Sequence, residues 1–123
     1  MWNMTLEQLL AEYAGLPEYL ILETGSVSVN SKSGFGNYPI NIAAVRGNIQ
    51  EITLLLERGS DINQIGEHGY TPLHEAVEQG LPEVVKLLID LGADAKLTND
   101  DGNTALDHAN LMNEQQVILL LTT

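Results

Sequence analysis

The stretch GYTPLHEAVEQGLPEVVKLLIDLGADAK, residues 69–96, contains one complete structural unit. Gly69 permits a tight turn, Thr71 is placed to cap a helix, and Pro72 occupies the first helical position, where its missing N–H costs nothing. Gly80 stands where a glycine in the left-handed conformation ends a helix. The first part of the unit therefore predicts a short helix that begins at Pro72 and ends at Gly80.

The second part of the unit predicts an amphipathic helix that begins at Pro82 and ends at Gly92. An apolar face as wide as that of this helix exceeds what one helix hairpin buries by itself, so neighbouring units must stack. The apolar stripe is expected to consist of Val84, Val85, Leu87, Leu88 and Leu91, and the solvent side of Glu83, Lys86 and Asp90.

The unit recurs along the chain with a period of 33 residues. Gly36, Gly69 and Gly102 open three segments at this spacing, and an alanine seven residues after each glycine keeps the same step. A helix hairpin repeated at a fixed period predicts an all-α solenoid of stacked helix-turn-helix units.

The quoted unit resembles the ankyrin repeat in its motifs GYTPLHEA, PEVVKLL and GAD. The first unit departs from the family pattern with Tyr38 for threonine and Asn41 for histidine, although Asn41 can still form hydrogen bonds. The third departs with Ala105 for proline and Asp107 for histidine, and there Thr104 and Asp107 predict a capping box. The resemblance implies an ankyrin-repeat solenoid whose work is to bind other proteins.

The N-terminal 35 residues precede this resemblance and are less regular. Thr5 and Gln8 predict another capping box, with a helix that runs to Gly15. Pro17 is expected to open a second helix, PEYLILETG, so this segment is interpreted as a degenerate repeat. We predict one domain, residues 1–123, made of a degenerate N-terminal capping repeat (1–33), two repeats (34–66 and 67–99) and a C-terminal capping repeat (100–123).

Charge and composition narrow the classes of partner. The chain has 17 acidic and five basic residues and a formal net charge of -12. Phosphate backbones and anionic membranes repel such a chain, so we expect a basic protein partner and neither nucleic acid nor membrane. Cysteine is absent, so packing alone holds the fold. No signal peptide is recognised and the longest apolar run is five residues, which predicts a cytoplasmic protein.

The stretch TNDDGNTALDHANL, residues 98–111, is the best candidate for a metal or acid–base site. A calcium loop with Gly102 at its sixth position would put Leu97 first and His108 twelfth, where a carboxylate and a glutamate are required. The repeat register instead makes residues 99–103 the tip of a turn, where short polar residues are expected for conformational reasons. A metal site remains the alternative to this structural interpretation.

His74 is the other candidate for chemistry, because a His-Glu pair occurs in metallohydrolase motifs. The pattern H-E-x-x-H fails, since position 78 is Glu78. The family resemblance implies that His74 is structural and forms hydrogen bonds within and between turns. With no cysteine nucleophile and no phosphate-binding loop, the chain is predicted to need no cofactor or metal and not to be an enzyme.

The resemblance also implies where a partner binds: on a concave face made by the turn tips and the exposed side of the first helices. The alternative is a solvated acidic surface, but large side chains such as Phe35, Tyr70, Leu111 and Met112 favour a partner there. The candidate residues are Phe35, Asn37, Glu67, His68, Tyr70, Asp100, Asp101 and Asn103 on the turns, and Val45, Arg46, Glu75, Glu78, Gln79, His108, Leu111 and Met112 on the first helices.

A small acidic ankyrin domain of this kind resembles bacterial immunity proteins that neutralise a toxin, often a basic nuclease. We therefore expect an inhibitor or antitoxin that binds a basic partner, and the alternative is an adaptor that binds without inhibiting. In the last helix, Leu119 takes the register position of Thr53 and Lys86, which are expected to face solvent. Either fraying at the chain end or a weak dimer or partner contact would explain an apolar residue there.

Overall fold

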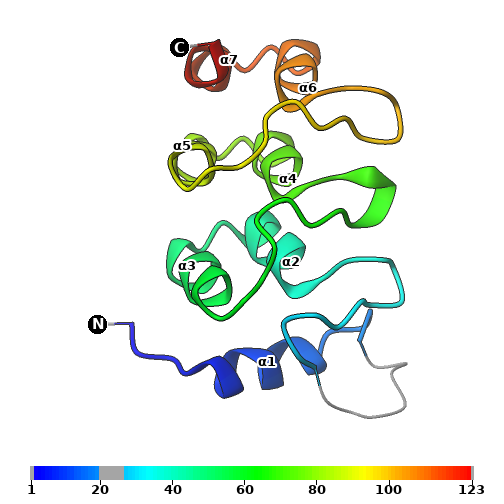
Figure 1. The fold of residues 1–123 in the computed structure, drawn as a ribbon, viewed down its shortest axis with the longest axis vertical. Helices are drawn as coiled ribbons and strands as arrows, with labels where there is room; N and C mark the ends of the chain where they lie inside the picture. The colour runs from blue at the N-terminus through cyan, green and yellow to red at the C-terminus, as the bar shows by residue number, and fades with distance from the viewer. Residues whose placement is uncertain (1, 20–26, 123) are drawn as a thin grey trace.

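The computed structural model describes residues 2–19 and 27–122. Within these residues every regular element is helical, and the molecule is an all-α helical solenoid (Figure 1). The elements are α1 (Leu6–Ala14), α2 (Pro39–Arg46), α3 (Ile49–Glu57), the 3₁₀ turn η1 (Glu67–Gly69), α4 (Pro72–Glu78), α5 (Pro82–Asp90), α6 (Ala105–Leu111) and α7 (Gln115–Thr122).

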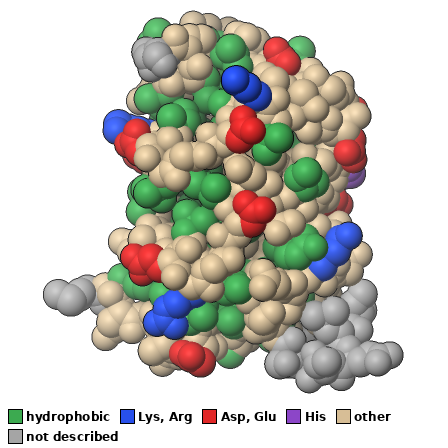
Figure 2. Space-filling model, viewed as in Figure 1, with side chains coloured by type: hydrophobic (Ala, Val, Ile, Leu, Met, Phe, Trp, Pro, Cys, Tyr) green, Lys and Arg blue, Asp and Glu red, His purple; other side chains and the backbone are tan. Residues whose placement is uncertain are grey.

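The helices stand in two columns along the long axis of the molecule. Figure 1 shows α2, α4 and α6 one above another, α3, α5 and α7 in a second column, and the connecting loops projecting away from that second column. In the same view, hydrophobic side chains gather on the side of α3 and α5 (Figure 2). The core runs between the columns and includes Leu9, Tyr13, Ile40, Ile52, Leu55, Leu73, Val77, Val85, Leu88, Ala105, Ala109 and Val117, all at most 2% exposed.

The helix starts predicted from Thr5, Pro72, Pro82 and Thr104 are confirmed. The Thr71 hydroxyl accepts from the His74 N–H at 3.3 Å, and Pro72 is the first residue of α4. The hydroxyl of Thr104 accepts from the Asp107 N–H at 3.1 Å, while the Asp107 carboxylate accepts from the Thr104 N–H at 3.0 Å. The capping box of Thr5 at the start of α1 has the same reciprocal form. These caps satisfy N–H groups that would otherwise lack partners at each helix start.

The first unit departs from prediction after α1. Residues 17–19 form a turn, with the Tyr19 N–H donating to the Leu16 carbonyl at 2.9 Å, and the α-helix expected to begin at Pro17 does not begin there. The Tyr19 hydroxyl bonds the carbonyls of Ser31, at 2.9 Å, and Asn37, at 3.1 Å, so the turn is held by the loop that follows. The remainder of the expected helix, residues 20–25, lies outside the described residues.

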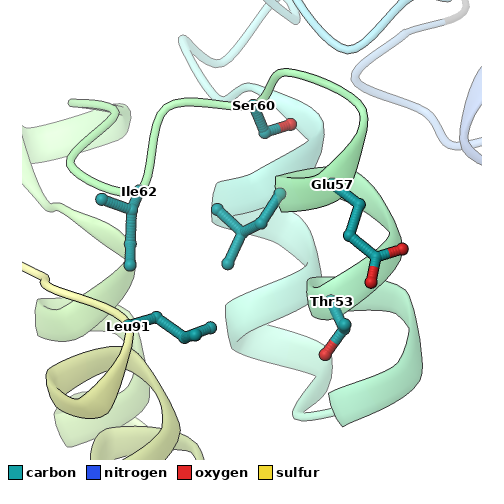
Figure 3. A pocket seen from close by; sticks show the side chains of 6 residues that line it. Thr53, Glu57, Ser60, Ile62 and Leu91 are labelled. Carbon is teal, nitrogen blue, oxygen red and sulfur yellow. The ribbon is translucent and has the colours of Figure 1, made fainter.

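Leu91 was predicted in the apolar stripe of α5, and this was wrong. Val84, Val85 and Leu88 are buried as expected, but Leu91 is 51% exposed. The helical periodicity ends at Asp90, and Leu91 is the C-cap residue. Its side chain lies across a surface crevice of about 380 Å³ between α5 and α3, opposite Thr53 and Glu57 (Figure 3).

The turn tips repeat the same hydrogen bonds at residues 33–37, 66–70 and 99–103. In each tip the first N–H donates to the fifth carbonyl, at 2.7, 2.8 and 2.9 Å respectively. The second N–H of each tip reaches back to the preceding unit, and this fixes the tips above one another. These second bonds run from Gly34 to the Glu18 carbonyl at 2.7 Å, from Glu67 to the Asn37 side-chain oxygen at 3.0 Å, and from Asp100 to the His68 carbonyl at 3.0 Å.

Gly66 is the one tip-opening residue without a side chain. Ser33 and Asn99, its equivalents, use their side-chain oxygens to accept N–H groups of their own tips. A Cβ at Gly66 would lie 2.6 Å from the Asn37 side-chain oxygen and 2.7 Å from that of Asn41. The middle tip therefore closes on the amide groups of the preceding unit, and this close approach requires glycine.

Candidate protein-binding surface

A cavity of about 370 Å³ opens between α2, α4 and the turn tips, and we refer to it as the concave cavity. The structure brings nine of the predicted site residues together around it. They are Asn37, Val45, Arg46, Glu67, His68, Tyr70, Glu75, Glu78 and Gln79; the remaining lining residues are Glu18 and Ile42.

Two of these lining residues, Glu18 and Ile42, were not predicted as site residues. The repeat register carries a signal for Ile42, because it stands 33 residues before Glu75 and 66 before His108. No sequence pattern points to Glu18. Its carboxylate reaches the cavity because the chain turns at residues 16–19, where a helix was expected.

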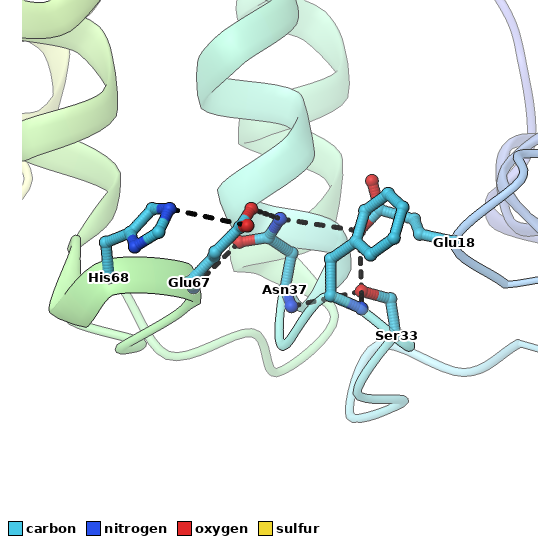
Figure 4. Close-up of polar contacts among 6 residues, drawn as sticks. Glu18, Ser33, Asn37, Glu67 and His68 are labelled. Atoms are coloured by element: carbon cyan, nitrogen blue, oxygen red, sulfur yellow. Dashed lines mark hydrogen bonds and ion pairs between the residues drawn. The ribbon is translucent and has the colours of Figure 1, made fainter.

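One wall of the concave cavity is a chain of polar contacts along the tips (Figure 4). Glu18 Oε1 accepts from the Ser33 hydroxyl at 2.5 Å and from Asn37 Nδ2 at 3.4 Å. The same Asn37 nitrogen donates to Glu67 Oε2 at 3.4 Å. His68 Nε2 lies 3.4 Å from Glu67 Oε1, and its side chain is 77% exposed. The Asn37 side-chain amide thus already donates to two carboxylates at the rim of the cavity, so it has less capacity to form hydrogen bonds with a partner.

Glu75 lies at the centre of the carboxylates. Burial raises its pKa from 4.5 to about 7, and repulsion from Glu78, Glu67 and Glu18 adds to the effect. No hydrogen bond or ion pair to its side chain is found within the described residues. The concave cavity therefore gathers four carboxyl groups, and their mutual repulsion and burial favour the neutral form of Glu75.

Arg46 is a cation of the concave cavity, but its charge is engaged elsewhere. Its Nη2 lies 2.9 Å from Glu51 and 3.6 Å from Glu12, and its guanidinium carbon lies 5.2 Å from the Tyr13 ring centroid. Burial raises the pKa of Glu51, and Arg46 opposes that rise. Arg46 thus compensates a carboxylate of α3, which is a structural task that its predicted place on the concave face did not suggest.

The third unit joins the second through His108. Its Nε2 pairs with Glu78, and its ring meets the Tyr70 ring edge to face with centroids 5.5 Å apart. The His108 side chain is only 12% exposed, so it is less accessible than a first-helix position on an open face would be. Burial raises the pKa of the Tyr70 hydroxyl, and Glu78, Glu75 and Asp101 raise it further.

The other predicted residues of the third unit do not line the concave cavity. Asp100 and Asp101 are exposed at the tip, and Asn103 is half-buried. Leu111 and Met112 are 72% and 39% exposed at the end of α6. Two further positions are exposed as expected: Phe35, at 59%, and Leu119 on α7, at 64%.

His74 is structural, as the resemblance implied. It is 1% exposed, its Nδ1 lies 2.8 Å from the Thr71 hydroxyl, and its Nε2 bonds the Asn103 carbonyl at 2.9 Å. Burial lowers the pKa of its imidazole, in keeping with a neutral ring. Across residues 2–19 and 27–122, no three His, Asp or Glu side chains are grouped to hold a metal ion.

The comparison with protein families agrees with this architecture. A family model described as ankyrin repeats, in three copies, matches residues 8–99. The chain belongs to the ankyrin repeat family. The match begins inside the segment interpreted as a degenerate repeat and ends before the last unit, although α6 and α7 stack on the preceding pair. No curated protein matches the chain in sequence.

Ankyrin repeats are protein–protein interaction modules, and that is the general function of this ankyrin domain. They generally work by binding and not by catalysis. None of the helices in the described part of the chain has the length and apolar character needed to cross a bilayer.

Proposed function

We propose that this ankyrin protein is an inhibitor that binds a basic protein through its concave face and neutralises it, in the manner of an immunity protein or antitoxin. The observation that carries the proposal is the concave cavity, into which Glu18, Glu67, Glu75 and Glu78 project. A basic surface supplies the charge that this face lacks.

The overall charge supports the same partner. A formal net charge of -12 creates a negative field that raises the encounter rate with cations and opposes phosphate backbones and anionic lipids. Exposed Phe35 and Leu111 stand at a tip and at the end of a first helix, where they can supply apolar contact beside the charged area. We therefore propose no nucleic acid or membrane partner, and no catalytic activity.

The test is capture of the partner from native lysate of the source cells, identification by mass spectrometry, and kinetics with the purified pair. We expect a basic protein whose association rate falls steeply as salt rises toward 1 M, where the Debye length shortens to about 3 Å. Tyr70→Ala and Asp101→Lys are each expected to weaken binding about tenfold or more. Glu83→Lys on α5 makes the same charge change on an exposed residue outside the concave cavity and is expected to leave binding nearly unchanged.

A partner that is acidic, or one that tolerates Tyr70→Ala and Asp101→Lys as well as it tolerates Glu83→Lys, would contradict the concave-face proposal. One further measurement, the activity of the captured protein in the complex, distinguishes an inhibitor from an adaptor. If the captured protein keeps its activity in the complex, the ankyrin protein is an adaptor and not an inhibitor.

A further inference from the structure

Three side chains supply the apolar part of the concave cavity's lining. Tyr70 is half-buried, Val45 is 39% exposed and Ile42 is 8% exposed. A cavity of about 370 Å³ is near the small end of ligand pockets, which span roughly 300–1,000 Å³. It has room for one extended side chain with an apolar stem and not for a folded element.

The polar groups that face the concave cavity are predominantly hydrogen-bond acceptors with negative charge. They come from three separate parts of the chain: the turn after α1 supplies Glu18, η1 supplies Glu67, and α4 supplies Glu75 and Glu78. The nearby basic side chains already contact carboxylates of the chain: His68 lies against Glu67, Arg46 against Glu51 and His108 against Glu78. An occupant must therefore bring its own positive charge and several donors.

We propose that the concave cavity binds one arginine side chain of the basic partner, with the guanidinium at Glu75 and at Glu78 Oε1, the oxygen that does not pair with His108, and the stem along Val45 and Tyr70. This assignment rests on the proposed function and specifies its central contact. Arginine fits better than lysine because a planar guanidinium presents five donors, pairs with more than one carboxylate, and stacks on an aromatic face.

The electrostatics of Glu75 agree with such an occupant. A carboxylate whose pKa lies about 7 is only partly ionised at neutral pH, and a guanidinium beside it favours the ionised form. Arginine binding should therefore release a proton and strengthen as pH rises from 6 to 8. The titratable groups around Glu75 are Glu78 on its own helix, Glu67 and His68 on η1, Glu18 on the turn after α1, Arg46 on α2, and His108 on α6, which pairs with Glu78.

The probe for the test is a capped pentapeptide with one arginine flanked by glycine and serine, titrated into the full chain while backbone amide shifts are recorded by NMR. One side chain is expected to bind with a dissociation constant on the order of millimolar. The shifts should concentrate at residues 67–79. A matched peptide with citrulline, which keeps the shape of arginine and removes its charge, is expected to bind at least tenfold more weakly.

The same titration on two variants locates the contact. Glu75→Gln is expected to weaken arginine-peptide binding about tenfold and to abolish its rise between pH 6 and 8. Glu83→Gln on α5 removes one exposed charge that does not line the concave cavity, and it is expected to bind the peptide as the unaltered chain does. Thermal unfolding of each variant confirms that it is folded.

Equal binding of the arginine and citrulline peptides, or unchanged binding by Glu75→Gln, would overturn the assignment. Equal binding of a lysine peptide would overturn the preference for a guanidinium. The proposed function fails separately: capture of an acidic partner would sink it even if the arginine peptide binds. Conversely, a basic partner that is sensitive to Asp101→Lys would uphold it even if the peptide does not bind.

Discussion

Arg46 and Glu51 form an ion pair of 2.9 Å in which the Glu51 side chain is 2% exposed and the Arg46 side chain is 35% exposed. The second carboxylate oxygen of Glu51 is buried and has no hydrogen-bond partner within the described residues. Arg46 also reaches Glu12 on α1, at 3.6 Å. The guanidinium therefore links α1, α2 and α3, and the buried charge of Glu51 depends on it.

Replacing Arg46 by methionine is expected to lower the free energy of unfolding by about 3 kcal/mol, because it leaves a buried carboxylate uncompensated. Adding Glu51→Gln to that variant should recover much of the loss, since the amide carries no charge. Urea unfolding of both single variants and the double variant measures the coupling. Arg58→Met, on an exposed residue after α3, is the control and should change stability by less than about 0.5 kcal/mol. If the changes in free energy of unfolding of the two single variants simply add up to that of the double variant, the two residues are not coupled.

Glu75→Gln is expected to stabilise the fold at pH 8. The folded pKa of Glu75, about 7, lies above its ordinary value of 4.5, so the folded chain retains a proton that the unfolded chain has already released. Stability therefore falls as pH rises through 4.5 to 7. Allowing for solvent screening at this half-buried site, the gain on substitution should be about 1–2 kcal/mol at pH 8 and should vanish at pH 4. Glu83→Gln, on exposed surface, should show no such pH dependence in thermal melts.

His74→Ala is expected to cost about 3 kcal/mol, since it empties a buried site, removes the hydrogen bond to the Asn103 carbonyl and leaves the Thr71 N–H without a partner. His74→Asn should cost less. At the equivalent position of the first unit, Asn41 accepts from the Tyr38 N–H at 2.8 Å and donates to the Gln64 carbonyl at 2.7 Å.

The control for the two His74 variants is His68→Asn, which makes the same change on an exposed tip whose φ of 60° asparagine tolerates. We expect a change within about 0.5 kcal/mol there. If chemical denaturation gives the same loss for His68→Asn as for His74→Ala, the hydrogen bonds of His74 are not what stabilises this interface.

Gly66→Ala is expected to destabilise the fold by about 1–3 kcal/mol, because the new methyl group would displace the side chains of Asn37 and Asn41. The φ of Gly66 is -112°, which alanine adopts freely, so crowding and not backbone strain causes the loss. At Gly15 an added Cβ would be in ordinary van der Waals contact, 3.4 Å from the Glu12 carbonyl oxygen, so Gly15→Ala should be neutral by differential scanning calorimetry. If Gly66→Ala leaves the stability unchanged, the middle tip can move away from the side chains of Asn37 and Asn41 with little loss of free energy.

The fold was predictable because its signals are local and repeat. Each helix start depends on a cap within four residues, as at Thr71 and Thr104, and the period of 33 residues places the units in a stack. Leu91 is exposed because α5 ends at Asp90, one residue before it. The glycine that follows Leu91 indicates where the helix ends only to within about a residue, so it did not predict this exposure.

The candidate site was only partly predictable, because its contacts join segments far apart in the chain. The register identified the residues of α4 and its tip that line the concave cavity. It did not identify Glu18, which arrives from an irregular turn, or show that Glu51 would bury a charge and engage Arg46. These depend on which side chains meet across units, and a residue's place in its own repeat does not specify that.

The hydrogen bonds that join each turn tip to the preceding unit all point the same way along the chain. In all three, the acceptor belongs to a unit earlier in the chain than the donor, as when the Asp100 N–H meets the His68 carbonyl. During synthesis at about 5–20 residues per second, every tip therefore leaves the ribosome after its support has been made. The domain can be completed in the order in which it is translated, with no tip waiting for a later unit to supply the acceptor of this bond.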